Sequence, residues 1–267
     1  VGAVLQLTER FEREGTRRLS LPAGYLTAKL KRGIPALAGE PIPVPTALIK
    51  PTILELCRIL QAHGGGEAAV RLAAAAGEDR LEIGPLATLT LRREQAAIRT
   101  AATQAGLGHD LLWLVADMGV SPFAHMLRFT LFDTCAPASP LRLALDHWTH
   151  GCCPLCGTWP TYADGSTAPR LLRCAFCAAA WSRAADTCVY CGTTGDRLVE
   201  LSTAPERAAR GVQACRSCRG YLKLTGDPDT LPFPLLPIGD LETLDLDMRA
   251  IQEGFARPAI RPPSPRR

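Results

Sequence analysis

Several features that would mark a common class of protein are missing or scarce in this sequence. No run of apolar residues approaches the length that spans a bilayer, so we expect no membrane insertion. Aromatic residues make up only 6% of the chain and the net charge is only +4. The glycine run at residues 64–66 has neither the lysine nor the hydroxyl residue of a phosphate-binding loop, and it predicts the end of a helix instead.

Patterns for catalysis and for nucleic-acid binding are also weak. No Ser/His/Asp or Cys/His grouping stands out, so we expect no enzymatic activity. Residues 151–226 carry eight arginines and one lysine against five acidic residues, a bias well short of a nucleic-acid-binding stripe. A nucleic-acid-binding double zinc ribbon nevertheless stays open as an alternative. It would place seven arginines on phosphates: Arg170, Arg173, Arg183, Arg207, Arg210, Arg216 and Arg219.

What the sequence does have is four Cys-x-x-Cys pairs in one stretch. Two residues between cysteines allow a tight backbone turn, a knuckle, that aims both sulfurs at one ion, and two knuckles complete a tetrahedron. Eight thiols therefore predict two four-sulfur metal sites. The pairs are Cys153/Cys156, Cys174/Cys177, Cys188/Cys191 and Cys215/Cys218.

The spacing between pairs favours a serial arrangement. Seventeen residues separate Cys156 from Cys174, inside the range of a zinc-ribbon site, and twenty-three separate Cys191 from Cys215. We therefore expect pairs one and two to form the first site and pairs three and four the second, with residues 178–187 as a connector. A cross-braced arrangement, in which the first and third pairs share an ion, stays open.

Other cysteines and the residues after each pair refine this prediction. Gly157 and Gly192 follow their pairs and allow the positive φ of a regular knuckle, whereas Ala178 and Arg219 predict less regular ones. Nothing at the N-terminus resembles an export signal, so a reducing, cytoplasmic location and metal binding are favoured over disulfides. Two lone cysteines, Cys57 and Cys135, are predicted to be buried packing residues, and Cys152 is either a substitute ligand or a spare thiol. His147, His150 and Trp181 are predicted to serve helix ends and packing.

The first 150 residues predict helices. Apolar spacing and glycine stops indicate helices at Thr52–His63 after Pro51, at Glu67–Ala76 and at Arg92–Ala105. Ser121-Pro122 and Ser139-Pro140 each predict a helix start, the second helix reaching Gly151. Residues 33–45, which contain four prolines, predict a linker or an extended surface segment.

Strands are expected around the knuckles and one helix after them. Thr158–Ala163 with Arg170–Arg173, and Leu198–Ser202 with Gly211–Ala214, predict two hairpins. The tail predicts one helix capped by Asp240 and ending at Gly254, with Asp245, Asp247 and Glu253 on its solvated face. Its apolar stripe is Leu241, Leu244, Met248, Ile251 and Phe255, and residues after Pro258 are expected to be disordered.

The order of these segments resembles the FdhE family, the accessory proteins of formate dehydrogenase assembly. The similarity covers about residues 145–258, and its C-terminal run is specific because zinc ribbons in general have no reason to share it. Arg219 departs from the family, which tends to have glycine directly after the last cysteine. The matching segments are CPLCG at 153–157, LRC at 172–174 leading to Trp181, CVYC at 188–191, CRSCRGYLK at 215–223, Asp240-Leu241 and LDMRAIQEGFAR at 246–257.

This resemblance implies a cytoplasmic, non-enzymatic helper that contacts the catalytic subunit of a molybdenum- or tungsten-dependent formate dehydrogenase. It implies two metal ions, each bound by four cysteines, and favours iron over zinc, although four thiolates suit either metal. The expected fold class is α+β: an N-terminal all-α domain, two tandem rubredoxin-like or zinc-ribbon modules and a C-terminal helix. The predicted boundaries are 1–150, 151–186, 187–226 and 227–267. A plain electron-transfer rubredoxin fused to a helical domain is a further alternative.

Overall fold

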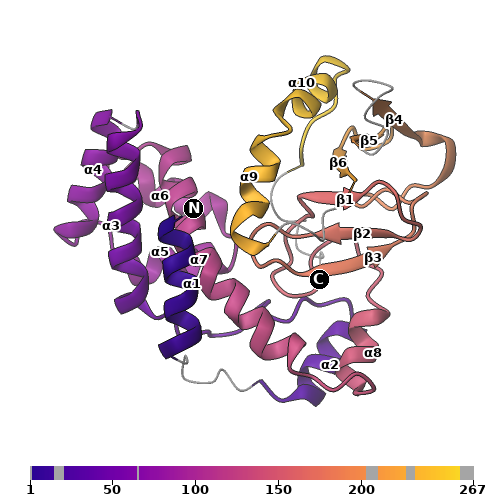
Figure 1. Ribbon diagram of the computed structural model, residues 1–267, viewed down its shortest axis with the longest axis horizontal. Helices are drawn as coiled ribbons and strands as arrows, with labels where there is room; N and C mark the ends of the chain where they lie inside the picture. The colour runs from indigo at the N-terminus through magenta and orange to yellow at the C-terminus, as the bar shows by residue number, and fades with distance from the viewer. Residues whose placement is uncertain (1, 15–20, 65, 203–209, 227–231, 259–267) are drawn as a thin grey trace. The chain divides into compact units, whose positions relative to one another are not determined.

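A computed structural model describes residues 2–14, 21–64, 66–202, 210–226 and 232–258. The fold is α+β, as predicted, with helices before a sheet and further helices after it (Figure 1). Contacts divide the chain into a helical unit, residues 1–20 and 39–130, and a sheet unit, residues 21–38 and 131–267. The four domain boundaries expected from the sequence stay a prediction. Within the described ranges, each helix is too short or too polar to cross a membrane.

The helical unit is organised around its longest helix, α7, which packs against α1, α3, α5 and α6. Small residues on α7 permit this contact on several sides: a Cβ at Gly119 would lie 2.9 Å from Ile53 Cγ1 of α3. Burial of apolar side chains from all these helices supplies the core of the unit. The helices are α1 (Gly2–Glu14), α3 (Thr46–Ala62), α4 (Gly66–Gly77), α5 (Ile83–Leu91), α6 (Gln95–Gln104) and α7 (His109–Arg128).

Two prolines lie inside these helices although the sequence predicted helix starts beside them. Pro51 lies in α3, which begins five residues before it, and Pro122 lies in α7. An internal proline costs on the order of 3 kcal/mol, and the buried apolar residues on both sides of each proline offset that cost. The predicted Arg92–Ala105 helix also begins later, at Gln95, because Arg93 has a φ of 59° and separates α5 from α6. Helix α4 agrees with its prediction within one residue at each end.

Two short helices, α2 (Ala23–Lys31) and α8 (Pro140–Asp146), pack together in the sheet unit. Ser139 caps α8 as predicted, because its hydroxyl accepts the N–H of Arg142 at 3.2 Å. The helix ends at Asp146, however, and not at Gly151. A π-helical turn (Phe129–Asp133) continues α7 into this unit.

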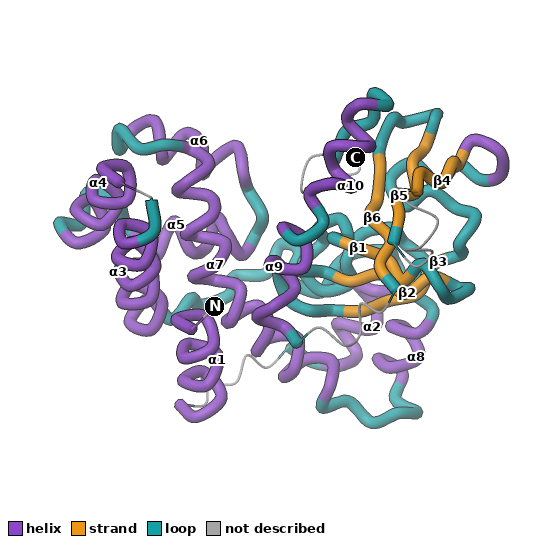
Figure 2. The backbone as a smooth tube through the Cα atoms, turned by 45° about the horizontal axis from the view of Figure 1, so that its top comes forward, coloured by secondary structure: helices purple, strands orange, loops and turns teal. Residues whose placement is uncertain are grey.

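The four cysteine pairs lie next to the strands of one six-stranded sheet, whose strand order is β3-β2-β1-β6-β5-β4. Figure 2 shows this sheet. The hairpins β1–β2 and β4–β5 are antiparallel, as the sequence predicted. Strand β3 lies in the predicted connector, and the parallel pair β1–β6 joins the two hairpins, which local spacing does not predict. The strands are β1 (Tyr162–Asp164), β2 (Arg170–Arg173), β3 (Ala180–Arg183), β4 (Leu198–Ser202), β5 (Gly211–Cys215) and β6 (Tyr221–Thr225); a 3-10 turn (Gly195–Arg197) precedes β4.

The C-terminal segment forms two helices and not one. After a 3-10 turn (Phe233–Leu235) come α9 (Leu236–Leu241) and α10 (Leu244–Gln252). Asp240 therefore lies within α9 and does not cap a helix. The predicted end at Gly254 agrees with its positive φ of 77°. Residues 259–267, where disorder was expected, lie outside the described residues.

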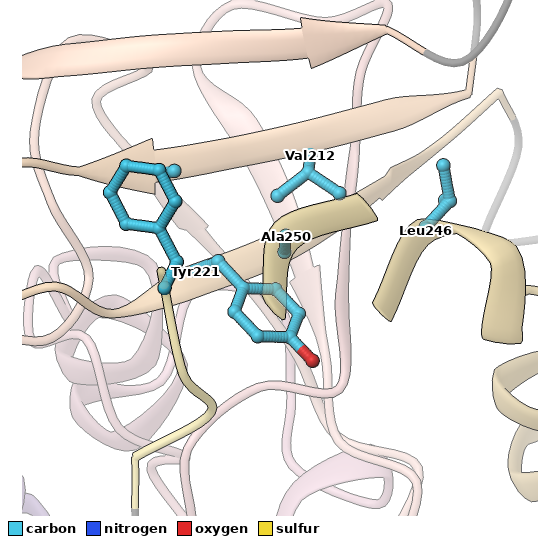
Figure 3. Close-up of a cluster of buried hydrophobic side chains, with 6 residues drawn as sticks. Val212, Tyr221, Leu246 and Ala250 are labelled. Atoms are coloured by element: carbon cyan, nitrogen blue, oxygen red, sulfur yellow. The ribbon is translucent and has the colours of Figure 1, made fainter. Parts of the chain in front are cut away.

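The buried face of α10 is not the predicted one. Leu246 and Ala250 pack against Val212 of β5 and Tyr221 of β6 in a core that also holds Ala214 and Phe255 (Figure 3). Four members of the predicted stripe, all but Phe255, are more than half exposed instead: Leu241, Leu244, Met248 and Ile251.

A buried lysine explains this orientation of α10. Lys223 of β6 is fully buried, and its Nζ lies 2.5 Å from Asp247 Oδ2 and 3.0 Å from Asp240 Oδ1. A buried ammonium without a partner costs several kcal/mol, so Asp247 faces the sheet. The prediction that Asp247 lies on the solvated face is therefore wrong.

Candidate metal centres

The four cysteine pairs share one backbone turn. In each pair the carbonyl of the first cysteine accepts the N–H of the residue four positions later, at 2.9–3.0 Å. That residue has a positive φ in every case: 77° at Gly157, 58° at Ala178, 75° at Gly192 and 60° at Arg219. The first cysteine also donates its own N–H to the carbonyl five positions later, at 2.7–3.0 Å. Both glycine predictions are confirmed, and the prediction of irregular turns at Ala178 and Arg219 is wrong.

The sulfurs fall into two clusters in the serial arrangement and not the cross-braced one. Within each cluster all four sulfurs lie within 4.8 Å of one another. In the first site Cys153 Sγ lies 3.5 Å from Cys177 Sγ, and Cys156 Sγ lies 3.6 Å from Cys174 Sγ. In the second site the Cys188–Cys218 and Cys191–Cys215 sulfur distances are both 3.7 Å.

These distances fit a tetrahedral ion and exclude disulfides. Four sulfurs at about 2.3 Å from one ion are about 3.8 Å apart, close to the observed values, whereas a disulfide bond is about 2.05 Å long. Four sulfur ligands complete the tetrahedron, so each site would hold its ion in a closed shell with no open position. The donor set fits zinc or iron equally.

The first site is buried, which disfavours the charged thiolate form of its cysteines unless a cation balances the charge. Burial raises the pKa of Cys153 and of Cys177 well above the ordinary thiol value. A divalent ion would reverse this effect by stabilising the deprotonated sulfurs. Thr158 Oγ1 lies 3.2 Å from both Cys156 Sγ and Cys174 Sγ, so its hydroxyl can hydrogen-bond either sulfur of the cluster.

A segment that the sequence predicted to be a linker covers this site. The N–H groups of Ala36 and Leu37 bond the carbonyls of Pro154 and Leu155 inside the first knuckle, at 2.8 and 2.9 Å. The Lys29 ammonium fixes this segment by bonding the carbonyl of Ala36 at 2.9 Å. Residues 33–38 are therefore a packed part of the first site.

The second site is partly open. Cys188 and Cys215 are buried, whereas Cys191 and Cys218 are exposed. Although burial acts to raise its pKa, hydrogen bonds from Thr193 lower the pKa of Cys191 to about 6. Burial raises the pKa of Cys218 to about 11.

Arg219 attaches the second site to α10. Its guanidinium bonds the carbonyls of Glu253 and Gly254 at 3.0 and 2.7 Å, and it lies over the Phe255 ring, 4.3 Å from the centroid. Its own carbonyl accepts the N–H of Ala256 at 2.9 Å. An arginine with positive φ is therefore present where glycine would be less strained, because its side chain binds the end of a helix.

Comparison with known proteins bears on these centres. No family model matches the sequence. The Protein FdhE homolog of Cronobacter sakazakii is 36% identical over 117 residues, which are 41% of this chain and 36% of that protein. Protein FdhE of Escherichia coli O127:H6 is 35% identical over 114 residues, again 41% of this chain and 36% of that protein. The match thus spans about a third of the length of these curated relatives.

A solved structure extends the likeness to almost the whole chain. The crystal structure of the FdhE protein from Pseudomonas aeruginosa matches with a TM-score of 0.61 and 22% identity. The match covers 96% of this chain and 84% of that one. The chain is similar in sequence to FdhE proteins over 41% of its length. The structural likeness shows a common fold.

The remaining cysteines and the histidine before the first knuckle have other surroundings. Cys57 is buried, as predicted, and burial raises its pKa to about 11, whereas Cys135 is only half-buried. Cys152 is also half-buried and belongs to neither cluster. The His147 ring contacts the Leu143 carbonyl at the end of α8, as predicted for a helix-terminal role.

Sequence reasoning missed both threonines beside the sulfurs, although the signal was present. Cys156-Gly157-Thr158 and Cys191-Gly192-Thr193 repeat the same three residues, and each threonine hydroxyl lies within 3.3 Å of a cysteine sulfur. Trp181 is buried as predicted and donates its indole N–H to the His150 carbonyl at 3.1 Å.

At least three of the seven arginines that a nucleic-acid-binding protein would use form ion pairs or hydrogen bonds within this chain. Arg170 pairs with Glu200, Arg183 bonds the carbonyls of Thr149 and Cys188, and Arg219 holds α10. Side chains engaged in this way are not available for phosphates, which argues against that alternative. Arg207 lies outside the described residues.

Proposed function

We propose that this protein is an accessory factor for the assembly of formate dehydrogenase. It would bind the catalytic subunit of a molybdenum- or tungsten-dependent enzyme before that enzyme is complete, in the cytoplasm. The observation that carries this proposal is the combination of an FdhE-like fold over nearly the whole chain with two four-cysteine clusters at the sequence-predicted positions.

The chemistry of the centres supports a scaffold and not a catalyst. Each cluster offers four sulfurs to one ion, so substrate would find no free coordination position. Small metal-bound ribbons bury little apolar surface, and structural ions supply on the order of 10 kcal/mol or more of folding free energy per site. The eight paired cysteines would thus hold the sheet rigid for recognition of the client. The likeness to FdhE favours iron in both sites.

The test combines metal analysis with client binding on the full chain. Anaerobically purified protein should contain two ions per chain, with thiolate charge-transfer absorption if the metal is iron and no colour if it is zinc. Cys153→Ser and Cys188→Ser should each lose metal and the ability to co-purify with the catalytic subunit. Cys135→Ser is the matched control, because this half-buried thiol belongs to neither cluster, and it should retain both.

Two outcomes would overturn the proposal. One is full client activation by a metal-free, cysteine-substituted protein. The other is binding to DNA or RNA at low ionic strength that weakens steeply with salt, which would support the nucleic-acid alternative instead.

A further inference from the structure

The two centres have the same ligands but different access to solvent. All four cysteines of the first site are buried, and the most exposed, Cys156, is 8% exposed. In the second site Cys191 and Cys218 are exposed. Each is the second cysteine of its pair, and the four sulfurs lie within 4.8 Å of one another. One edge of the second tetrahedron is therefore formed by two exposed residues, Cys191 and Cys218.

The first site is closed by a separate part of the chain. Residues 35–37 lie on the first knuckle through two backbone hydrogen bonds, and the Pro35 ring approaches Gly157, where a Cβ would lie 3.2 Å from Pro35 Cγ. Lys29 holds this cover through the carbonyls of Ala36 and Ala38. An incoming ligand could reach the first ion only after the cover had opened.

In the second site a backbone hydrogen bond from another segment reaches the fourth knuckle next to Cys215. In the fourth knuckle the Arg216 N–H donates a hydrogen bond to the Arg197 carbonyl, beside the buried Cys215. On the other side Arg219 turns away to bind the end of α10. Cys218, between these two contacts, remains exposed.

Exchange of a thiolate-bound ion proceeds by stepwise ligand replacement. A donor atom of an incoming chelator must approach the ion as one sulfur leaves, and the released thiolate stays in water or takes up a proton. No electron transfer is involved. The exposed edge allows this step in the folded state, whereas the buried cluster requires local opening first.

We propose that the second site is an exchangeable metal site, whose ion passes to and from soft chelators across the Cys191–Cys218 edge. The first site holds its ion as a permanent cross-link of the fold. This inference rests on the metal binding in the proposed function. Because Arg219 follows Cys218 directly and binds the end of α10, loss of the second ion should also loosen that helix end.

The test uses the full chain loaded with two zinc ions and an excess of the chromogenic chelator 4-(2-pyridylazo)resorcinol. Release should occur in two phases of one ion each, with rates at least about tenfold apart, equivalent to about 1.4 kcal/mol of opening free energy. The free cysteines are alkylated between the two phases and identified by peptide mass spectrometry. Alkylation should then be found at Cys188, Cys191, Cys215 and Cys218 and be low at the four cysteines of the first site.

A variant on the first site provides the matched control. Lys29→Met removes the hydrogen bonds from the Lys29 ammonium to the carbonyls of Ala36 and Ala38 and changes no cysteine. It should accelerate the slow phase several-fold and leave the fast phase unchanged.

The link between the second site and α10 is tested on the unsubstituted chain. Amide hydrogen exchange at residues 250–256, around the end of α10, should become faster when the fast phase is complete and the first ion is still bound.

The outcomes separate the two proposals. A protein that binds fewer than two ions contradicts the metal binding on which the proposed function rests. Two bound ions released at one rate, or alkylation of the first site before the second, overturn the exchange proposal and leave the proposed function standing.

Discussion

The orientation of α10 can be tested with two leucines that differ in position by two residues. Leu246 is 1% exposed and packs with Val212, Tyr221 and Ala250, whereas Leu244 is 53% exposed. Leu246→Ala removes a buried side chain from a close-packed cluster, which costs about 2–5 kcal/mol of unfolding free energy. Leu244→Ala removes an exposed one and should change it by less than about 0.5 kcal/mol. Both changes are neutral or favourable in helix propensity, so the difference reports packing alone.

Guanidinium unfolding of the cobalt-loaded protein is the assay. The thiolate–cobalt absorption follows the sheet unit, and unfolding of the helical unit does not contribute to it. Leu246→Ala should lower the midpoint without changing the slope, and Leu244→Ala should coincide with the wild type. A larger loss for Leu244→Ala, or equal losses, would refute the assignment of the buried face and restore the stripe predicted from spacing.

Two further substitutions test the knuckles by the same assay. Gly151→Ala would place a Cβ 1.7 Å from the Val189 carbonyl oxygen and should lower the unfolding free energy of the sheet unit by more than about 2 kcal/mol. Gly24→Ala is the control, because a Cβ there meets nothing within 4 Å, and it should cause no such loss. Equal stability of the two variants would contradict the contact at Gly151. Arg219→Ala and Arg219→Gly both lose the hydrogen bonds to the end of α10. The alanine keeps the strain of a positive φ and the glycine relieves it, so the glycine variant should be more stable by about 1 kcal/mol. An alanine variant as stable as the glycine variant would show that the turn carries no strain.

Local patterns predicted the elements whose partners are close in the chain. The Cys-x-x-Cys pairs, the hairpins β1–β2 and β4–β5 and the Ser139 cap depend on contacts within about thirty residues, and the structure agrees with each. A knuckle is a single turn, so its residue types describe it almost completely. The repeated Cys-Gly-Thr was equally local, and its threonines could have been found in the same way.

Predictions failed where distant segments compete with local preference. Pro51 and Pro122 are good helix-start signals, but burial on both sides of each proline keeps the longer helix. The apolar spacing predicts a stripe that is mostly exposed, because Lys223 on β6 requires Asp247 on the inner face of α10. A helical pattern identifies two possible faces, and only the partner decides which one is buried.

The sequence by itself determined that there are eight paired thiols and that the fold is α+β, and it favoured the serial combination of the pairs, because ligand spacing and short-range hydrogen bonding depend on neighbouring residues. Only the tertiary structure decided that the two ribbons share one sheet, that residues 35–37 close the first centre and that Cys191 and Cys218 leave the second one open. Solvent access depends on which remote segment lies over a sulfur. Such contacts join residues more than a hundred positions apart, as between Ala36 and Pro154, and no local pattern encodes them.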